Sequence, residues 1–142
     1  MKQSHCIILN GFILFFLFSG LTNSQIIDTD TNDVVIRKTS KEKPAEFNIS
    51  DVIIKPDKEK TKYIARADLE IPLSTTLKLN ITDSMGAVIM YLINDQTLKA
   101  GIYRVKWEME KCTSSDCDYP PGKYLCSFET DQFIYQKDFY LK

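Results

Sequence analysis

Histidine is almost absent from this 142-residue sequence, which contains only His5. His5 precedes an apolar N-terminal run that we expect to be cleaved, so the mature chain has no imidazole. This excludes Ser-His-Asp and Cys-His catalysis and any zinc site that needs a histidine ligand. Carboxylates such as Glu108, Glu110 and Glu129 remain, but no spacing singles them out as a catalytic pair. We predict no enzyme, hence no catalytic residues, no cofactor and no metal site; a carboxylate-dependent enzyme is the distant alternative.

Long apolar runs are also scarce, and the one present extends from Ile8 to Leu21. Lys2 before this run and small residues after it are typical of a signal peptide, with cleavage after Ser24. The run is shorter than the roughly 20 residues that cross a bilayer, which argues against the alternative of a retained anchor. We predict a signal peptide over residues 1–24. The mature chain should be secreted or held in the cell envelope, without membrane insertion.

Neither sign of charge dominates the composition. The sequence has 18 Lys+Arg and 19 Asp+Glu, which gives a formal net charge of −1. A nucleic-acid-binding domain typically has a clear excess of basic residues on one face. We therefore predict no nucleic-acid partner.

No segment shows the 3.6-residue period of an amphipathic helix, whereas apolar and polar residues alternate in several stretches. Turn residues such as Asp83–Gly86 separate these stretches. Short alternating strands with frequent turns predict an all-β, antiparallel sandwich with Trp107 as a core anchor. The alternating stretches are residues 63–71, 77–82, 102–108 and 124–128.

Residues 25–50 do not share this alternation, because they are polar and loosely patterned. We predict a poorly ordered leader in this segment, with at most one edge strand at Val34–Ile36. The domain itself is then predicted to span residues 51–142, a length that suits one domain and is too short for two.

Four elements of this region follow an order that is typical of one bacterial family. The second contains the pattern Ala-Gly-x-Tyr-x-Val-x-Trp, and the third begins with Pro-Gly-x-Tyr. By this order and spacing, the chain from Val52 to Lys142 resembles the bacterial Ig-like domains of flagellar hook-capping proteins and of type IX secretion C-terminal sorting domains. The four elements are Leu77–Gly86, Leu98–Trp107, Pro121–Phe128 and Gln136–Lys142.

The resemblance implies an immunoglobulin-like antiparallel β-sandwich of about seven strands. It also implies a secreted or cell-envelope interaction or sorting module, whose partner is a protein of the secretion or surface machinery. The alternative is a stand-alone periplasmic or extracellular accessory protein that binds a protein or glycan through loops or an edge strand. Both interpretations leave the oligomeric state open.

Three cysteines remain after cleavage, namely Cys112, Cys117 and Cys126, an odd number for an oxidising compartment. We predict a Cys112–Cys117 disulfide at a hairpin tip. Alternation places Cys126 inward, as a buried free thiol. The alternatives are a bridge from Cys126 to either of the other two, and a three-thiolate metal site, which lacks the paired C-x-x-C spacing of such sites.

The stretch from Val88 to Ile93 is apolar on both faces. One face of a strand normally suffices for the core, so the other is free to bind a partner. We predict a candidate interaction surface formed by Ile89, Tyr91 and Ile93; the alternative is a strand covered on both sides within the domain.

Two triplets match the N-glycosylation pattern, at Asn48 and Asn80. They are candidate sites only if the source is eukaryotic, and the family resemblance favours a bacterial source. Alternation directs Asn80 outward, which would make it accessible.

Overall fold

The computed structural model describes residues 26–28, 34–114 and 116–142. These residues form ten strands and no helix, and therefore contain no helix that is long and apolar enough to cross a membrane. The signal peptide predicted for residues 1–24 lies outside the described residues.

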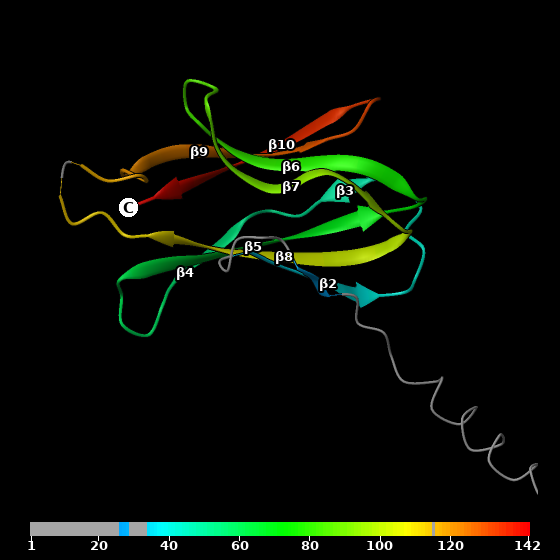
Figure 1. Cartoon of the computed structure of the whole chain (residues 1–142), viewed down its shortest axis with the longest axis horizontal. Coiled ribbons are helices and arrows are strands. Elements are labelled where there is room, and N and C mark those ends of the chain that lie inside the picture. The colour runs from blue at the N-terminus through cyan, green and yellow to red at the C-terminus, as the bar shows by residue number, and fades with distance from the viewer. Residues whose placement is uncertain (1–25, 29–33, 115) are drawn as a thin grey trace, which may run out of the picture.

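The strands form two antiparallel sheets that face each other (Figure 1). The order in the first sheet is β1-β2-β8-β5-β3, and β4 pairs with β5 as well; the order in the second is β10-β9-β6-β7. This arrangement confirms the predicted antiparallel β-sandwich. The first sheet comprises β1 (Ile26–Asp28), β2 (Val34–Ser40), β3 (Asn48–Ile49), β4 (Ile53–Pro56), β5 (Lys62–Ile71) and β8 (Gly101–Glu110), and the second comprises β6 (Thr75–Asp83), β7 (Val88–Leu98), β9 (Gly122–Glu129) and β10 (Ile134–Leu141).

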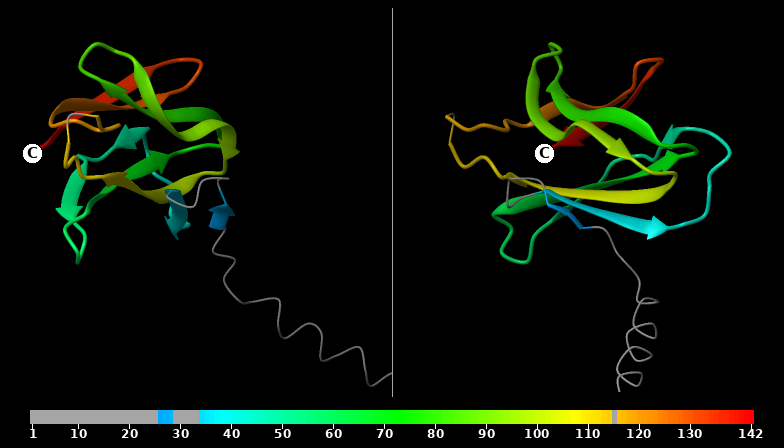
Figure 2. Two further views of the ribbon diagram at one scale, coloured as in Figure 1. Left: turned by 60° about the vertical axis from the view of Figure 1, so that its left-hand side comes forward. Right: turned by 45° about the vertical axis from the view of Figure 1, so that its right-hand side comes forward.

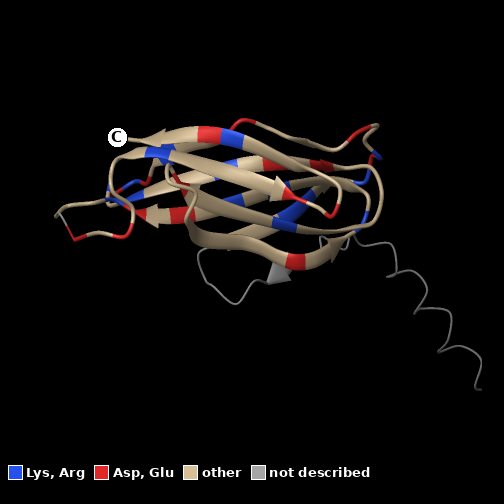
Figure 3. Cartoon of the chain, turned by 90° about the horizontal axis from the view of Figure 1, so that it is seen from above, with Lys and Arg blue, Asp and Glu red and all other residues tan. Residues whose placement is uncertain are grey.

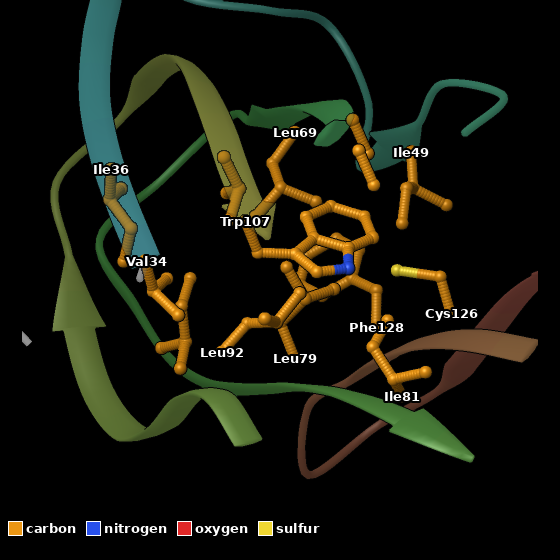
Figure 4. Packing of buried hydrophobic residues seen from close by; sticks show 14 of the residues in the cluster. Val34, Ile36, Ile49, Leu69, Leu79, Ile81, Leu92, Trp107, Cys126 and Phe128 are labelled. Atoms are coloured by element: carbon orange, nitrogen blue, oxygen red, sulfur yellow. The ribbon is translucent and has the colours of Figure 1, made fainter. Parts of the chain in front are cut away.

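The core lies between the two layers, which Figure 2 shows from two further directions. Successive residues of a strand point to opposite faces of its sheet, so each strand sends about every second side chain inward. Trp107 of β8 is 0% exposed and lies among Leu69 of its own sheet and Leu79 and Phe128 of the other (Figure 4). The predicted core anchor is thus confirmed.

The leader predicted for residues 25–50 is wrong from Val34 onward, although the strand predicted at Val34–Ile36 is present and continues to Ser40. It is not an edge strand, because β1 pairs with its other side. Strand β2 pairs with β8, from Val34 opposite Trp107 to Ser40 opposite Ile102. Its two inward residues, Val34 and Ile36, are 6% and 0% exposed. Two buried apolar side chains and a backbone ladder along a central strand are sufficient to order a segment that is otherwise polar. The domain therefore includes residues from Val34 onward.

The predicted turn at Asp83–Gly86 joins β6 and β7. The Asp83 carboxylate oxygen Oδ1 accepts hydrogen bonds from the backbone N–H groups of Met85 and Ala87, each at 2.9 Å. Gly86 has a φ of 87°, a conformation that glycine adopts without steric strain. The turn holds the start of β7 in place.

Candidate interaction surface

Strand β7 does not alternate regularly, and this corrects the predicted surface. Its pairing with β6 shifts between Leu79 opposite Ile93 and Asn80 opposite Tyr91, which leaves Leu92 as an extra residue. The extra residue of a β-bulge interrupts the alternation of side chains. As a result Leu92 and Ile93 are both 1% exposed. The assignment of Ile93 to the interaction surface is therefore wrong.

The other two predicted residues differ from each other. Ile89 is half-buried and packs against the core, whereas Tyr91 is 53% exposed. Tyr91 lies opposite Asn80, so both side chains point to the outer face of the four-stranded sheet. Val88, which is 43% exposed, lies opposite Thr82 on the same face. The exposed large apolar residues of this strand are thus Tyr91 and Val88.

Two rows of directly opposite residues cross this outer face from β10 to β7. We call them the outer rows. Their single charged member, Asp138, pairs with Lys123 at 3.4 Å. Figure 3 shows this sheet in front, with long uncharged stretches along its strands. The first outer row is Gln136, Ser127, Asn80 and Tyr91, and the second is Asp138, Leu125, Thr82 and Val88.

The centre of the outer rows contains polar atoms without partners. Asn80 and Thr82 are 6% and 8% exposed, and neither Asn80 Oδ1 nor Thr82 Oγ1 has a hydrogen-bond partner among the described residues. A buried polar group without a partner costs about 1–3 kcal/mol. Ser127 in the same row differs, because Gln136 Nε2 donates a hydrogen bond to its hydroxyl oxygen at 3.1 Å. Asn80 Oδ1 and Thr82 Oγ1 each expose less than 1 Å², so these two unused hydrogen-bonding groups lie just beneath this face, and a partner reaches them only if the side chains that cover them move.

The structure separates the two candidate glycosylation sites. Asn48 is exposed, whereas Asn80 faces outward but is buried by its neighbours in the sheet. The expectation that Asn80 is accessible is therefore wrong. Alternation predicts the direction in which a side chain points, but not whether neighbouring side chains on the same face cover it.

Cys112 and Cys117 form the predicted disulfide, with Cα atoms 5.5 Å apart. The bridge does not lie at a hairpin tip. Strand β8 belongs to the first sheet and β9 to the second, so residues 111–121 cross from one layer to the other. A bridge that closes such a small loop contributes about 2 kcal/mol by loop entropy. It restrains the crossing rather than a hairpin.

Cys126 is a free, fully buried cysteine, with Sγ directed toward Trp107 (Figure 4). Burial raises the pKa of its thiol to about 12, which keeps it protonated and inert at neutral pH. The bridges from Cys126 to the other cysteines do not occur. No group of three or more His, Cys, Asp or Glu side chains that could hold a metal ion occurs among the described residues.

The chain matches no protein-family model, no curated protein and no solved structure. The resemblance to hook-capping and sorting domains therefore stays a prediction, and the surface is interpreted from its own chemistry. Asn80 Oδ1 can accept a hydrogen bond, and Thr82 Oγ1 can donate or accept one. Beside them, the Tyr91 ring offers a large contact area at low entropic cost.

Thr82 and Val88 were missed in the sequence. The alternation that directs Leu77 and Leu79 inward already directs Thr82 outward, so this was a usable signal. The position of Val88 depends on the bulges in β7, which have no signature in the sequence.

Proposed function

We propose that this chain is a non-catalytic, secreted or cell-envelope interaction module that binds a protein through the outer rows of its four-stranded sheet. The observation that carries the proposal is the exposed pair Tyr91 and Val88 at the β7 end of the outer rows, whose single charged member, Asp138, lies at the β10 end. Protein interfaces combine aromatic anchors with a centre that is depleted of charge. The unpaired Asn80 Oδ1 and Thr82 Oγ1 lie beneath this surface, so a partner that supplies their hydrogen bonds must first displace the side chains that cover them.

Two tyrosines support an Ig-like module. Tyr103 and Tyr124 lie near the starts of β8 and β9, and each donates a hydrogen bond from its hydroxyl to the carbonyl oxygen four residues earlier, that of Lys99 or Pro120. Immunoglobulin-like sandwiches use a tyrosine in this way to fix a corner between strands. Both tyrosines belong to the motifs that carry the family resemblance, Ala-Gly-x-Tyr and Pro-Gly-x-Tyr, and these hydrogen bonds give those motif positions a structural role.

The disulfide supports secretion. Bridges such as Cys112–Cys117 form and persist in oxidising compartments and are rare in the cytosol. The apolar N-terminal run points to the same compartment. A protein partner in the envelope or outside the cell fits both features.

Within this proposal the narrower role is sorting by a type IX machinery, which rests on the family resemblance. Fractionation of the native protein, with mass spectrometry of its C-terminus, tests it. Sorting predicts an extracellular chain that lacks β10, since sorting domains are recognised at the C-terminus. An intact chain that stays in the periplasm would contradict it.

The second candidate is a stand-alone accessory protein, and strand β7 favours it. Among the described strands β7 pairs with β6 alone. An open edge can pair with an extended segment of a partner, and such pairing relies on backbone hydrogen bonds. In that case the partner would lie along the edge of β7, and not across the outer rows.

A photocrosslinking experiment tests the proposed surface. A photoreactive phenylalanine analogue placed at Tyr91 should crosslink to an envelope protein in native cells, and one placed at the exposed Lys58 should not. The purified pair should then lose roughly tenfold or more in affinity on Tyr91→Ser, which removes an aromatic anchor. Equal crosslinking from both positions, or unchanged affinity of Tyr91→Ser, would contradict the proposal.

A further inference from the structure

All three arginines of the sequence lie on one face of the molecule. Arg37 is on β2, Arg104 on β8 and Arg66 on β5, which are neighbouring strands of the six-stranded sheet. Their side chains point away from the core and are exposed. The chain has 18 Lys+Arg in total, so its fifteen lysines are distributed over the chain while its arginines are gathered. Arginine is the residue best suited to paired hydrogen bonds with carboxylate, sulfate or phosphate groups.

The register places each of these arginines directly opposite another positively charged residue. Arg37 lies opposite Arg104, and Arg66 lies opposite Lys106. Arg104 and Lys106 are two residues apart on β8 and so share its outer face. Together the four residues form a continuous diagonal across three strands, which we call the basic track. Lys55 on β4, opposite Ile64, extends its line by one further strand.

This arrangement is unfavourable for folding alone. Like charges directly opposite each other in a sheet destabilise it. Asp68 compensates one of the four, since its two carboxylate oxygens accept hydrogen bonds from Arg104 Nε and Nη2 at 2.9 and 3.0 Å. Among the described residues, Arg37, Arg66 and Lys106 take part in no ion pair. The track therefore contains three positive charges that no ion pair among the described residues neutralises.

We infer that the basic track binds a linear anionic polysaccharide that bears sulfate or carboxylate groups. From the spacing of strands and of residues along them, the line from Arg37 to Lys55 is about 20 Å long, and it is one side chain wide. A chain that lies along it meets cations at successive steps. Asp68 holds two of the five N–H donors of Arg104. The remaining donors stay available in a fixed orientation, so Asp68 is a positioning residue.

Other anionic partners fit this face less well. Glu70 and Glu108 flank the track on β5 and β8, so a broad anionic plane such as a membrane would also meet these carboxylates. A peptide would gain no backbone hydrogen bonds, because the backbone groups of these central strands are already paired in the sheet. A single polysaccharide chain is narrow enough to lie between these carboxylates, and its binding does not depend on backbone hydrogen bonds. The inference concerns the opposite sheet from the outer rows and does not rest on the proposed function.

Titration of the purified protein with heparin oligosaccharides and with oligogalacturonates tests this inference. The variant Arg37→Gln/Arg66→Gln should bind roughly tenfold more weakly or worse, and its affinity should depend less steeply on salt. Arg37→Lys/Arg66→Lys keeps the charge but loses the paired N–H donors of the guanidinium groups. Its affinity should therefore lie between those of the wild type and of the Gln variant. The control Lys43→Gln/Lys99→Gln removes the same net charge from exposed loop positions and should bind like wild type.

The outcomes separate the inference from its rivals. Both track variants should fold normally, since they replace exposed residues and the Gln pair relieves like-charge repulsion; thermal unfolding checks this. Absence of binding to both probes would overturn the inference, and so would an equal loss in the Lys43/Lys99 control. Tighter binding to vesicles containing phosphatidylglycerol, or to single-stranded DNA, would also overturn it.

Discussion

The Tyr103 hydroxyl donates a hydrogen bond to the carbonyl oxygen of Lys99 across 2.8 Å, four residues earlier in the chain. The bond closes the tight connection between β7 in one sheet and β8 in the other. Burial raises the pKa of Tyr103, and this exceeds the lowering by the Lys99 hydrogen bond. The Tyr103 hydroxyl therefore stays protonated, and its hydrogen bond to the Lys99 carbonyl oxygen persists, throughout the physiological range of pH.

Removal of this hydroxyl should destabilise the fold without changing its shape. Tyr103→Phe leaves the Lys99 carbonyl oxygen without its donor, which costs about 1 kcal/mol. Tyr91→Phe is the control, since the Tyr91 hydroxyl lies on an exposed side chain and its removal should have no measurable effect. Urea unfolding measures both, and equal stabilities of the two variants would contradict the proposed corner.

The Asp57 carboxylate should make stability depend on acid pH. The backbone N–H of Lys62 is the largest cause that lowers the pKa of this carboxyl below 3.8, and contacts with Thr61 lower it further. Because the folded pKa is lowered, the contribution to stability is present above the unfolded value of 3.8 and is lost as pH falls through the folded pKa.

Asp57→Asn should therefore be less stable than wild type at neutral pH, and the difference should shrink as the solution is acidified below the range in which carboxyls titrate. Urea unfolding at a series of pH values measures this. Glu59→Gln, in the same turn, is the matched control and should follow the wild-type curve. A constant difference between Asp57→Asn and wild type at every pH would show that the carboxylate charge is not involved.

Much of the sandwich was predictable because its central strands alternate strictly. In β5 and β8 every inward position is apolar, and the two strands pair over their whole length without a shift. Strand β2 was predicted only in part, as an edge strand at Val34–Ile36, because Val34 and Ile36 alone point inward and the rest of the segment is polar. What orders β2 is its neighbour β8, a long-range contact that a local pattern cannot contain.

The candidate site was predicted less well than the fold. Tyr91 is exposed, as its place in the predicted surface requires, but the bulge that moves Leu92 and Ile93 into the core depends on the pairing of β7 with β6. Likewise, the burial of Asn80 depends on side chains from neighbouring strands. The disulfide was predicted from the short spacing of Cys112 and Cys117 together with the inward alternation of Cys126, whereas the crossing between sheets that it restrains was not.

Gly101 should tolerate substitution less well than Gly86. Both have positive φ, 152° and 87°, where any other residue is strained. A Cβ at Gly101 would lie 2.3 Å from Lys38 Cε and 2.9 Å from the Ser40 carbonyl oxygen, whereas one at Gly86 would meet no atom within 4 Å. Lys38 cannot easily move away, because its Nζ donates a hydrogen bond to the Ala100 carbonyl oxygen at 2.7 Å.

Gly86→Ala should therefore cost about 1 kcal/mol, the value of the backbone strain alone. Gly101→Ala should cost clearly more, because it also displaces Lys38 and β2 from the start of β8. Thermal unfolding of the two variants, measured side by side, checks the order. The account of this close approach fails if Gly101→Ala is as stable as Gly86→Ala.

The buried thiol of Cys126 should make stability depend on alkaline pH. Burial raises its pKa from 9.0 to about 12, so the folded state binds a proton that the unfolded state releases. The contribution to stability is fully present below pH 9 and is lost as the pH rises toward 12. Tyr103 and Tyr124 also have raised pKa values, so the effect of the thiol has to be isolated by substitution.

Cys126→Ala in a Cys112→Ser/Cys117→Ser background isolates it, because no thiol–disulfide exchange can then occur. At neutral pH the added Ala substitution should destabilise the protein by about 1 kcal/mol, through loss of a packed sulfur in the core. Above pH 9 the two stabilities should converge, since only the variant with Cys126 loses stability through the thiol. Guanidinium unfolding between neutral pH and about pH 11 measures this convergence. Parallel curves would mean that the thiol has the same pKa in the folded and in the unfolded chain. In that case Cys126 would not be buried away from water.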